Sequence, residues 1–486
     1  MFSNTSYISR TGLLCALLIL TLWYIPYSFE LLLVLNICLI LAVGISRIYL
    51  VSNKQKNNVL HLPQGHKPMV SVHIPICSEP VSVVIDTIEA AVQQTYTNYE
   101  IIVLYNNTED QNLWKPIESY CKKYPGLIKF YQIPFVRGYK AGALNLCREY
   151  THPSAAYIFT VDADYQLHPK ALQTAIHHAD VRRADVVQFP QAYFNTHTAT
   201  SGLSDNFEHY FTIYSQGSSD YKSTLPTGTL SLIDVEALDA IGGWTFESIT
   251  EDAELGIRLL DKQFRITFID RTIGRGLMPS DIKTLCKQRV RWIFGNFQLL
   301  LYQFRFKNIP LLQRWASVTQ LSAWINFLGV PFAALLITSL LQIANPAKPV
   351  GHIYELSIGS IGLHLALQTW LLRLSLKEYS FPKHMALLWT HVAFWRLGAF
   401  CWWPCLLGVQ KPFERTDKFG IKNSLNYRDF LIPMICIAAG IVSYTTYSTV
   451  MGGILHFLGV LSLSSVLYLY SQISFFQKEK TITKTL

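Results

Sequence analysis

Hydrophobic positions are concentrated towards the two ends of this chain of 486 residues. The first 51 residues and roughly the last 170 are apolar, whereas the stretch from about Lys54 to Trp292 has the composition of a globular domain. Near the N-terminus, residues 13–27 and 31–51 form two runs that approach the length of about 20 residues needed to span a bilayer. No A-x-A-like cleavage site follows the first run, so the pattern predicts a transmembrane hairpin rather than a signal peptide.

Five further apolar runs follow the central stretch, at about residues 321–343, 353–372, 384–409, 430–447 and 451–473. The third run contains His391 and Arg396, and an arginine at the centre of a bilayer is costly. Basic residues flank this run on both sides, so the positive-inside rule places both of its ends in the cytosol. We therefore expect interfacial helices there and about six transmembrane spans in the whole chain, with the central domain and the C-terminal tail in the cytosol.

The central stretch alternates between short β-rich runs and helical patterns. Strands are expected at residues 70–76, 101–105, 128–133, 157–161 and 186–189. Helices are expected between them, at residues 81–94, 111–122, 141–149 and 169–179. This alternation predicts an α/β domain with a largely parallel sheet. Ligands bind beyond the carboxyl ends of the strands in such sheets, so the chemistry is expected in the segments that directly follow each strand.

The composition of the chain indicates which binding partners to expect and whether its cysteines are reduced. Charged residues make up only 15% of the chain, against roughly 25% in soluble domains. The net charge is +9, and the basic residues cluster near the ends of apolar runs, which suits anionic lipid headgroups better than nucleic acid. The nine cysteines show no C-x-x-C spacing. We therefore expect reduced thiols rather than disulfides or a zinc site.

A pair of carboxylates follows the fourth expected strand, at Asp162 and Asp164. In an extended chain, positions i and i+2 point to the same side, so the two groups would converge. They could then hold Mg²⁺ or Mn²⁺ together with a diphosphate. The metal would neutralise the charge that builds up on a leaving nucleoside diphosphate. The simpler alternative is an acidic turn that caps the next helix.

A second acidic segment, Ser248-Ile249-Thr250-Glu251-Asp252, precedes an apolar-periodic helix. Ser248 and Glu251 have the spacing of a capping box, which is the purely structural interpretation. The functional interpretation makes Asp252 a general base that removes a proton from an acceptor hydroxyl.

Three further segments contain candidate site residues. Gln288-Arg289-Val290-Arg291-Trp292 is either a juxtamembrane cluster or an acceptor site, in which Trp292 stacks on a sugar and the arginines lie near a diphosphate. Lys140 opens an expected helix, where it could receive phosphate. Residues 412–418 form either a solvated loop or part of a site.

Taken together, the order of these motifs resembles the processive family 2 glycosyltransferases, which include cellulose, hyaluronan and chitin synthases. The shared elements are D-x-D, T-E-D, Q-R-x-R-W and F-x-R-T-x-K, and the resemblance covers roughly residues 10–475. It implies a GT-A-type, Rossmann-like α/β domain in the cytosol, inserted in an α-helical bundle of about six spans plus interfacial helices. The implied parts are two N-terminal transmembrane helices (1–53), the glycosyltransferase domain (54–292), and a helical part with a gating loop at 410–420 (293–486).

The resemblance also implies roles for individual residues. Asp162 and Asp164 would bind the metal, Mg²⁺ or Mn²⁺, together with UDP, and Asp252 would be the catalytic base. The donor and acceptor sites would be completed by Glu79, Asn106, Lys140, Thr250, Glu251, Gln288, Arg289, Arg291, Trp292 and, in the gating loop, Thr416. Members of the family usually carry an aspartate that reads the uracil at the position of Asn106. An asparagine presents a donor as well as an acceptor, so the nucleotide preference stays open.

Within this family, the chain particularly resembles bacterial β-glucan synthases of the cyclic-glucan and curdlan-like kind. The segments that carry this likeness are residues 106–110, 113–118, 138–145, 187–191, 242–244 and 274–279. The resemblance implies an inverting enzyme of the bacterial inner membrane that polymerises a β-glucan, preferably β-1,3-linked, from UDP-glucose. Its partners would be the donor, the growing glucan and the bilayer, with export or regulatory subunits undefined and no nucleic acid.

Three alternatives remain open. The donor could be UDP-N-acetylglucosamine, as in chitin-like or poly-N-acetylglucosamine synthases. The enzyme could be non-processive and add one sugar to a membrane lipid. The chain could also be a catalytically silent membrane subunit, although it retains Asp162, Asp164, Asp252 and Trp292.

Overall fold

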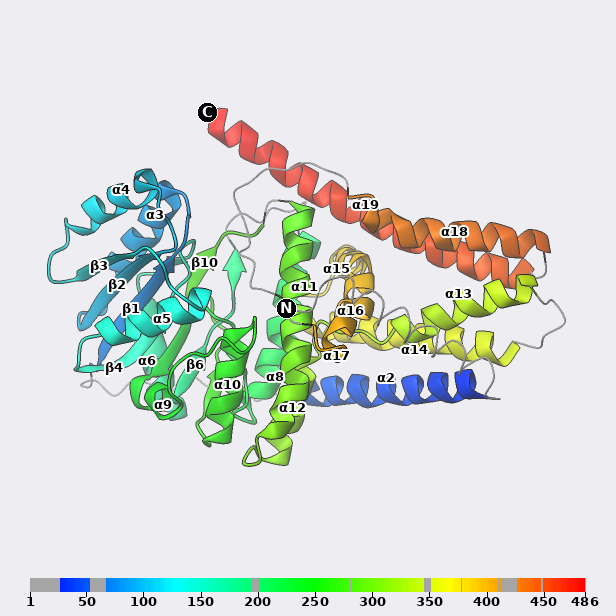
Figure 1. Ribbon diagram of the computed structural model, residues 1–486, viewed down its shortest axis with the longest axis horizontal. Coiled ribbons are helices and arrows are strands. Elements are labelled where there is room, and N and C mark those ends of the chain that lie inside the picture. The colour runs from blue at the N-terminus through cyan, green and yellow to red at the C-terminus, as the bar shows by residue number, and fades with distance from the viewer. Residues whose placement is uncertain are drawn as a thin grey trace.

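The computed structural model describes residues 27–52, 67–193, 201–279, 281–344, 351–376, 378–409, 411, 426–446 and 449–485. The apolar run at 13–27 lies outside this range apart from its last residue, and the expected gating loop at 410–420, with Thr416, lies outside it apart from Lys411. An α/β domain forms one end of the molecule, and long helices extend from it on the other side (Figure 1). Helices α11 (Ile282–Tyr302) and α12 (Leu311–Leu321) stand between the two parts (Figure 1).

A seven-stranded sheet forms the centre of the α/β domain, with the order β3-β2-β1-β4-β8-β6-β9. Its strands are β1 (Met69–Ile76), β2 (Tyr99–Asn106), β3 (Ile128–Ile133), β4 (Ala155–Thr160), β6 (Val186–Gln188), β8 (Ser231–Asp234) and β9 (Ile266–Phe268). The run from β3 to β4 is parallel, whereas β8 pairs antiparallel with both β4 and β6. The expectation of a largely parallel sheet is therefore correct for one half, and the sheet as a whole is mixed.

Four of the five strands that the sequence predicts, β1 to β4, have long apolar runs, and the short β6 is the exception. Strands β1 and β2 are almost wholly buried, as expected for parallel strands with both faces covered. The missed strands are short: β8 and β9 in the main sheet, and β5 (Gln166–Leu167), β7 (Ala192–Tyr193) and β10 (Gly274–Gly276) in a small second sheet. Runs of two to four residues are too short to show a period of two, so the missed strands have no pattern of their own, whereas β6 is marked by Val186 and Val187.

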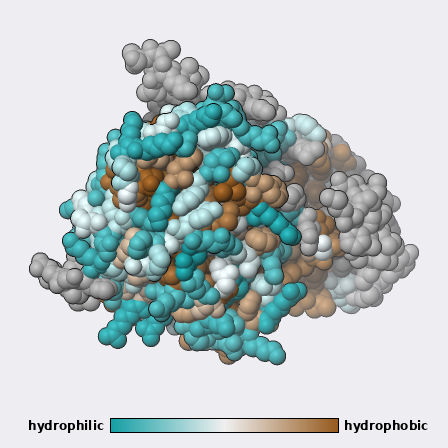
Figure 2. Space-filling view, turned by 60° about the vertical axis from the view of Figure 1, so that its left-hand side comes forward, coloured by the Kyte–Doolittle hydropathy of each residue, from teal (hydrophilic) through white to brown (hydrophobic). Residues whose placement is uncertain are grey.

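Helices α3 (Val81–Val92), α4 (Gln111–Cys121), α5 (Tyr139–Tyr150) and α6 (Ala171–Arg182) alternate with these strands as the sequence predicts. Helix α10 (Glu251–Asp261) contributes buried leucines to a second core with β8 and β9, beside the main core around β1 and β2. Hydrophilic side chains cover most of the surface of the α/β domain, while hydrophobic side chains gather where the helical part recedes behind it (Figure 2).

The helical part contains α2 (Ser28–Ser52), α13 (Gly329–Ala344), α14 (Gly351–Ser375), α18 (Arg428–Thr446) and α19 (Thr449–Thr485). Among the described residues, Ser28–Ser52 and Val450–Ile473 are long and apolar enough to cross a membrane, and Gly329–Ser339 and Asp429–Tyr444 are shorter apolar helices. The expected bundle of six spans is therefore not confirmed, because the described residues contain two helices of sufficient length and hydropathy. The run at 384–409 folds as three short helices, α15 (Phe381–Ala393), α16 (Trp395–Phe400) and α17 (Trp403–Leu406).

The run at 321–343, expected as one span, is not a continuous helix, because the chain leaves the helical conformation between α12 and α13. Polar contacts hold this break in place. The guanidinium of Arg47 on α2 donates to the carbonyl of Ser322 over 2.7 Å. The side chain of Asn326 donates to the carbonyl of Trp395, and its backbone N–H donates to the carbonyl of Gly398. A hydropathy pattern does not register such contacts between distant segments.

Candidate active site

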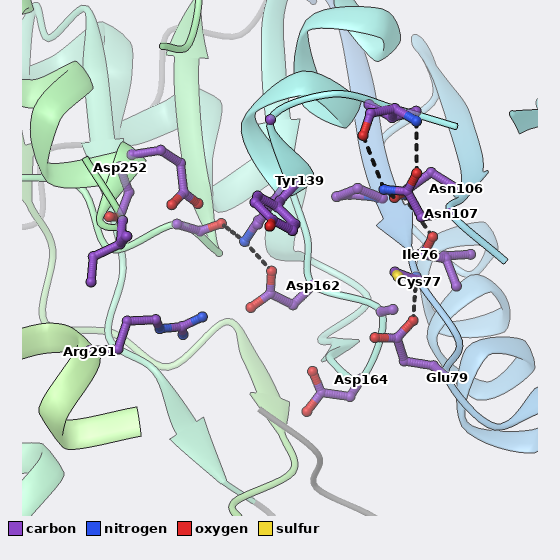
Figure 3. A pocket seen from close by; sticks show the side chains of 18 of the residues that line it. Ile76, Cys77, Glu79, Asn106, Asn107, Tyr139, Asp162, Asp164, Asp252 and Arg291 are labelled. Atoms are coloured by element: carbon purple, nitrogen blue, oxygen red, sulfur yellow. Dashed lines mark hydrogen bonds and ion pairs between the residues drawn. The ribbon is translucent and has the colours of Figure 1, made fainter. Parts of the chain in front are cut away.

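A cavity of about 860 Å³ opens at the carboxyl ends of β1, β2 and β4 and is closed on one side by α10 and α11. Eleven of the thirteen residues that the sequence singled out line this cavity: Glu79, Asn106, Lys140, Asp162, Asp164, Thr250, Glu251, Asp252, Gln288, Arg291 and Trp292. Asp252, Asp162 and Arg291 face a shared space, while Asn106 and Glu79 lie on the other side (Figure 3). This volume lies within the usual range of small-molecule and cofactor sites.

Lys140 and Asp162 form an ion pair in this cavity. The ammonium of Lys140 also donates to the carbonyl of Gly228 over 2.7 Å, and the backbone N–H of Asp162 donates to the hydroxyl of Thr229. Burial lowers the pKa of Lys140, but the charges of Asp162 and Glu251 outweigh this effect and shift it upward. Lys140 thus lies at the start of α5 as expected, with its charge directed at Asp162.

The D-x-D segment is a turn rather than an extended strand end. Strand β4 ends at Thr160, and the backbone N–H of Tyr165 donates to the carbonyl of Asp162, which closes the turn. The segment does not cap a helix, because the next helix, α6, begins only at Ala171 with Lys170 as its N-cap. Asp164 accepts the backbone N–H of Leu277 over 3.0 Å. The turn therefore brings both carboxylates to the cavity.

These carboxylates are chemically suited to a divalent cation that arrives with a diphosphate. Within the described residues, no three histidine, cysteine or acidic side chains gather at one point to form a complete metal site. A nucleotide-bound Mg²⁺ or Mn²⁺ does not need such a site, since it commonly takes one or two protein carboxylates and completes its shell with phosphate oxygens and water. Asp162 and Asp164 would supply the carboxylates.

Asp252 lies in the first turn of α10. The N-cap of this helix is Thr250, whose side chain makes no capping bond, and Ser248 instead accepts the backbone N–H of Thr250. The capping-box interpretation is therefore wrong. Burial and the adjacent carboxylate of Glu251 raise the pKa of Asp252 to about 7, against the opposing charges of Lys140 and Arg291. A carboxylate that titrates near neutral pH is suited to act as a general base.

Gly228 allows the backbone to approach Asp252 and Lys140 closely. Its φ of +81° lies in the left-handed region, and a Cβ atom at this position would lie 3.0 Å from Oδ2 of Asp252 and 3.4 Å from Nζ of Lys140. A side chain here would be strained and would also press on both groups.

Helix α11 presents one face to the cavity, formed by Gln288, Arg291 and Trp292. These positions are related by i, i+3 and i+4, so they lie on the same side of the helix. Oε1 of Gln288 is buried and has no hydrogen-bond partner among the described residues. Burial lowers the pKa of Arg291, partly offset by Glu251, Asp252 and Asp162. Arg289 points away from this face and does not line the cavity, so its expected place near a diphosphate is not supported by its position.

The far end of the cavity carries the expected base-reading position. Nδ2 of Asn106 donates to the carbonyl of Ile76 over 2.8 Å, and Nδ2 of Asn107 donates to Oδ1 of Asn106 over 3.2 Å. Because a carbonyl oxygen lies beside the Asn106 amide nitrogen, the orientation of the amide is fixed. Its oxygen, which has a second lone pair, is the acceptor that remains for a ligand. Glu79 accepts the backbone N–H of Cys77.

The sequence analysis missed several aromatic residues of the cavity: Phe135, Tyr165 and Tyr193. Tyr165 directly follows the D-x-D segment, and Tyr193 lies on the two-residue strand β7. Neither Tyr165 nor Tyr193 belongs to a periodic pattern. Both are positioned by the small second sheet, of which β5 directly follows Tyr165 and β7 contains Tyr193, and the sequence did not predict this sheet.

Two protein-family models match the chain. The model described as glycosyl transferase family group 2 covers residues 157–409, and the model described as glycosyl transferase family 2 covers residues 71–242. A probable glycosyltransferase of Sulfolobus acidocaldarius is 22% identical over 68% of this chain and 72% of its own length. A glucomannan 4-beta-mannosyltransferase of Arabidopsis thaliana is 27% identical, and a UDP-forming cellulose synthase catalytic subunit of Xanthomonas axonopodis is 25% identical.

The matches to the last two proteins cover 51% and 54% of this chain, but only 47% and 36% of theirs. Among solved structures, the mannosyltransferase PcManGT of Pyrobaculum calidifontis, in complex with GDP-Man and Mn²⁺, aligns with a TM-score of 0.53 at 15% identity. This alignment covers 75% of this chain and 99% of that one, and it establishes the fold as GT-A-type. The relatives indicate a hexosyltransferase. The chain belongs to glycosyl transferase family group 2, and cellulose and glucomannan synthases are among its homologues at low identity.

Proposed function

We propose that this protein is a membrane-bound, processive, inverting glycosyltransferase that builds a β-glucan from UDP-glucose in the cytosol. The observation that carries the proposal is the shared cavity, in which the carboxylate of Asp252 and the ring of Trp292 lie with the Asp162–Asp164 turn. A base, a place for a diphosphate and an aromatic platform for the acceptor are the parts that a single inverting displacement requires.

In the proposed reaction, Asp252 accepts the proton of the acceptor hydroxyl while that oxygen attacks the anomeric carbon of the donor. The new C–O bond forms as the bond from the anomeric carbon to the diphosphate breaks, and the electron pair leaves with the nucleoside diphosphate. Lys140 and Arg291 direct positive charge into the space that the diphosphate would occupy. A divalent ion held by Asp162 and Asp164 would further neutralise this leaving group.

On the acceptor side, Gln288 and Trp292 are placed to hold the terminal sugar. The unpartnered Oε1 of Gln288 can accept a sugar hydroxyl, and the indole of Trp292 offers an apolar face for the ring. Both residues lie on α11, which leads from the α/β domain to the helical part. The product would therefore begin its path at the membrane side of the cavity, and we propose that the helical part carries it across the bilayer.

Two features support the location in a membrane and the metal-bound donor. Ser28–Ser52 and Val450–Ile473 have the length and composition of membrane spans. PcManGT, which shares the fold, is in complex with a nucleotide-sugar and Mn²⁺. We propose Mg²⁺ or Mn²⁺ for this chain and, from the motif resemblance, a β-1,3 linkage.

One observation favours a second donor, GDP-mannose. Asn106 stands where an aspartate is expected, and the relatives include a glucomannan 4-beta-mannosyltransferase. The oxygen of Asn106 can accept the N3–H of uracil and equally the N1–H of guanine.

The test supplies the protein in nanodiscs with Mg²⁺ and one radiolabelled donor at a time: UDP-glucose, UDP-N-acetylglucosamine or GDP-mannose. High-molecular-weight product from UDP-glucose that a β-1,3-glucanase digests is the expected result. Polymer from another donor alone would retain the mechanism and overturn the sugar. Product confined to the lipid fraction would instead establish the non-processive alternative.

A further inference from the structure

Arg289 occupies an unusual position behind the active-site cavity. Its side chain is buried and lies among four aromatic rings, with Cζ 4.1 Å from the ring centroid of Trp324, 4.7 Å from Phe207, 4.9 Å from Phe394 and 5.7 Å from Trp292. We call these four rings and the guanidinium the Arg289 cage. Within the described residues, the guanidinium donates one side-chain hydrogen bond, to Oδ1 of Asn206 over 2.6 Å, and Nε has no partner.

The cage separates two spaces. On one side lies the active-site cavity, which Trp292 lines. On the other side lies a polar cavity of about 40 Å³, lined by Arg289 and Trp324 and, deeper in the helical part, by Arg47, His209, His364, Gln368 and His391. The two cavities share no lining residue. The polar cavity continues into an apolar one between α13, α14, α15 and α19, with which it shares Asn326, His364, His391 and Trp395.

Simple packing does not account for this arrangement. In the described part of the chain, Nε of both Arg289 and Arg47 is buried without a hydrogen-bond partner, and no carboxylate forms a salt bridge with Arg289. A buried cation with so few partners is costly, and polar groups inside a helical bundle commonly mark a path for a substrate. The cavity is large enough for only a few water molecules, so in this conformation nothing larger can pass.

The guanidinium of Arg289 also occupies the position over an aromatic ring that a sugar ring would take. It is flat, and it lies over Trp324 as the apolar face of a pyranose ring would. The rings of Trp292 and Trp324 have centroids 5.3 Å apart, so a sugar leaving Trp292 would meet Trp324 next.

We propose that the Arg289 cage is a saccharide subsite that Arg289 fills and closes until a growing chain displaces it. This inference rests on the proposed function, because it assumes that the acceptor is a polysaccharide. The arginine leaves the rings as a sugar enters, and it seals the polar cavity again when the product has left. Phe207, Trp324 and Phe394 then form the walls of the subsite.

The test needs no sugar donor. Gln368→Cys, on α14, places a thiol at the wall of the polar cavity. A membrane-impermeant methanethiosulfonate is added to the protein in nanodiscs, and modification is quantified peptide by peptide by mass spectrometry, with native Cys77 of the active-site cavity as the internal reference. We expect slow modification of the introduced thiol in Gln368→Cys and at least about tenfold faster modification when Arg289→Ala is added. Arg305→Ala, which removes an exposed arginine just beyond the same helix, is the control and should leave the rate unchanged.

A second measurement tests the subsite itself. In the double variant Gln368→Cys/Arg289→Ala, a β-1,3-linked glucose pentamer should slow the modification of the introduced thiol, whereas polyethylene glycol of equal mass should not. Should Arg289→Ala fail to fold, Arg289→Lys serves instead, because lysine keeps the charge but cannot stack as a plane. Equal rates with and without the Arg289 substitution would overturn the proposal, and so would no effect of the pentamer in a protein that makes β-1,3-glucan from UDP-glucose. The effect of Arg289→Ala on the modification rate does not depend on polymer synthesis, on the donor or on the linkage, so failure of the cage and failure of the proposed function give different results.

Discussion

Lys140 at the start of α5 forms an ion pair with Asp162 in the turn after β4, and its ammonium also donates to the carbonyl of Gly228. Three separate segments therefore meet at a single nitrogen atom. The donor diphosphate would enter beside this contact, and the affinity for nucleotide should depend on the charge of Lys140.

Lys140→Met should weaken UDP binding by about tenfold to a hundredfold, because a hydrogen bond to a charged group contributes about 1.5–3 kcal/mol. Isothermal titration calorimetry with UDP and Mg²⁺ measures this change. Lys129→Met, which removes an ion pair with Glu100 elsewhere in the domain, is the matched control. Unchanged affinity in Lys140→Met would exclude Lys140 from the donor site.

The pH dependence of turnover should report on Asp252. Its folded pKa is raised to about 7, and a base acts only when deprotonated, so kcat/KM should fall as the pH drops below about 7. Glu251→Gln removes a neighbouring negative charge, which lowers this pKa and moves the limb of the profile to lower pH. The exposed Glu247→Gln is the control for the loss of one charge. An acid limb of the kcat/KM profile at the same pH in Glu251→Gln as in the wild type would contradict the assignment of Asp252 as the general base.

The raised pKa of Asp252 also predicts that the free energy of unfolding changes with pH. A carboxyl group with a raised folded pKa binds its proton more tightly in the folded state, so its ionisation destabilises the fold as the pH rises from about 4 towards 7. Asp252→Asn should remove this contribution, and its melting temperature should fall less than that of the wild type over this range. Parallel curves for the two proteins would mean that Asp252 titrates normally.

Trp292→Ala should reduce polymer elongation by about tenfold while leaving hydrolysis of the donor nearly intact, because stacking on an aromatic ring contributes roughly 1 kcal/mol beyond the area buried. The two rates are measured together, as labelled polymer and as free sugar. Trp370→Ala, which removes an exposed tryptophan of α14, is the control. Equal losses of elongation and hydrolysis would argue against a role in holding the acceptor.

Gly228→Ala should lower turnover and also the melting temperature. The left-handed φ of +81° costs an alanine roughly 1 kcal/mol, and its Cβ would press on Oδ2 of Asp252. Gly126→Ala is the matched control, since Gly126 has a φ of +86° but open space around its Cβ position. A loss of activity of equal size in both variants would mean that only backbone strain matters.

Much of the architecture could be predicted because the strong local signals agree with the fold. Strand β1 and helix α3 follow from a long apolar run and a helical period, and the polar residues at the strand ends do meet in one cavity. Strand β8 was not predicted, because its four residues carry no period and its antiparallel place in the sheet depends on β4 and β6, which are distant in the chain.

Other features depend on geometry that no single segment contains. In the sequence, Arg289 and Arg291 look equivalent, but the phase of α11 turns Arg291 into the active-site cavity and Arg289 into the aromatic cage. The break after α12 depends on Arg47, which lies 275 residues earlier in the chain. The pairing of Lys140 with Asp162 likewise joins two motifs whose roles were inferred separately.

The most direct test of the proposed function compares the wild type with Asp252→Asn in nanodiscs containing Mg²⁺ and labelled UDP-glucose. The wild type should produce high-molecular-weight glucan, and the variant should bind UDP with similar affinity but lose synthesis by at least about a hundredfold, the usual contribution of a general base. Polymer made by Asp252→Asn at the wild-type rate would contradict the proposed mechanism.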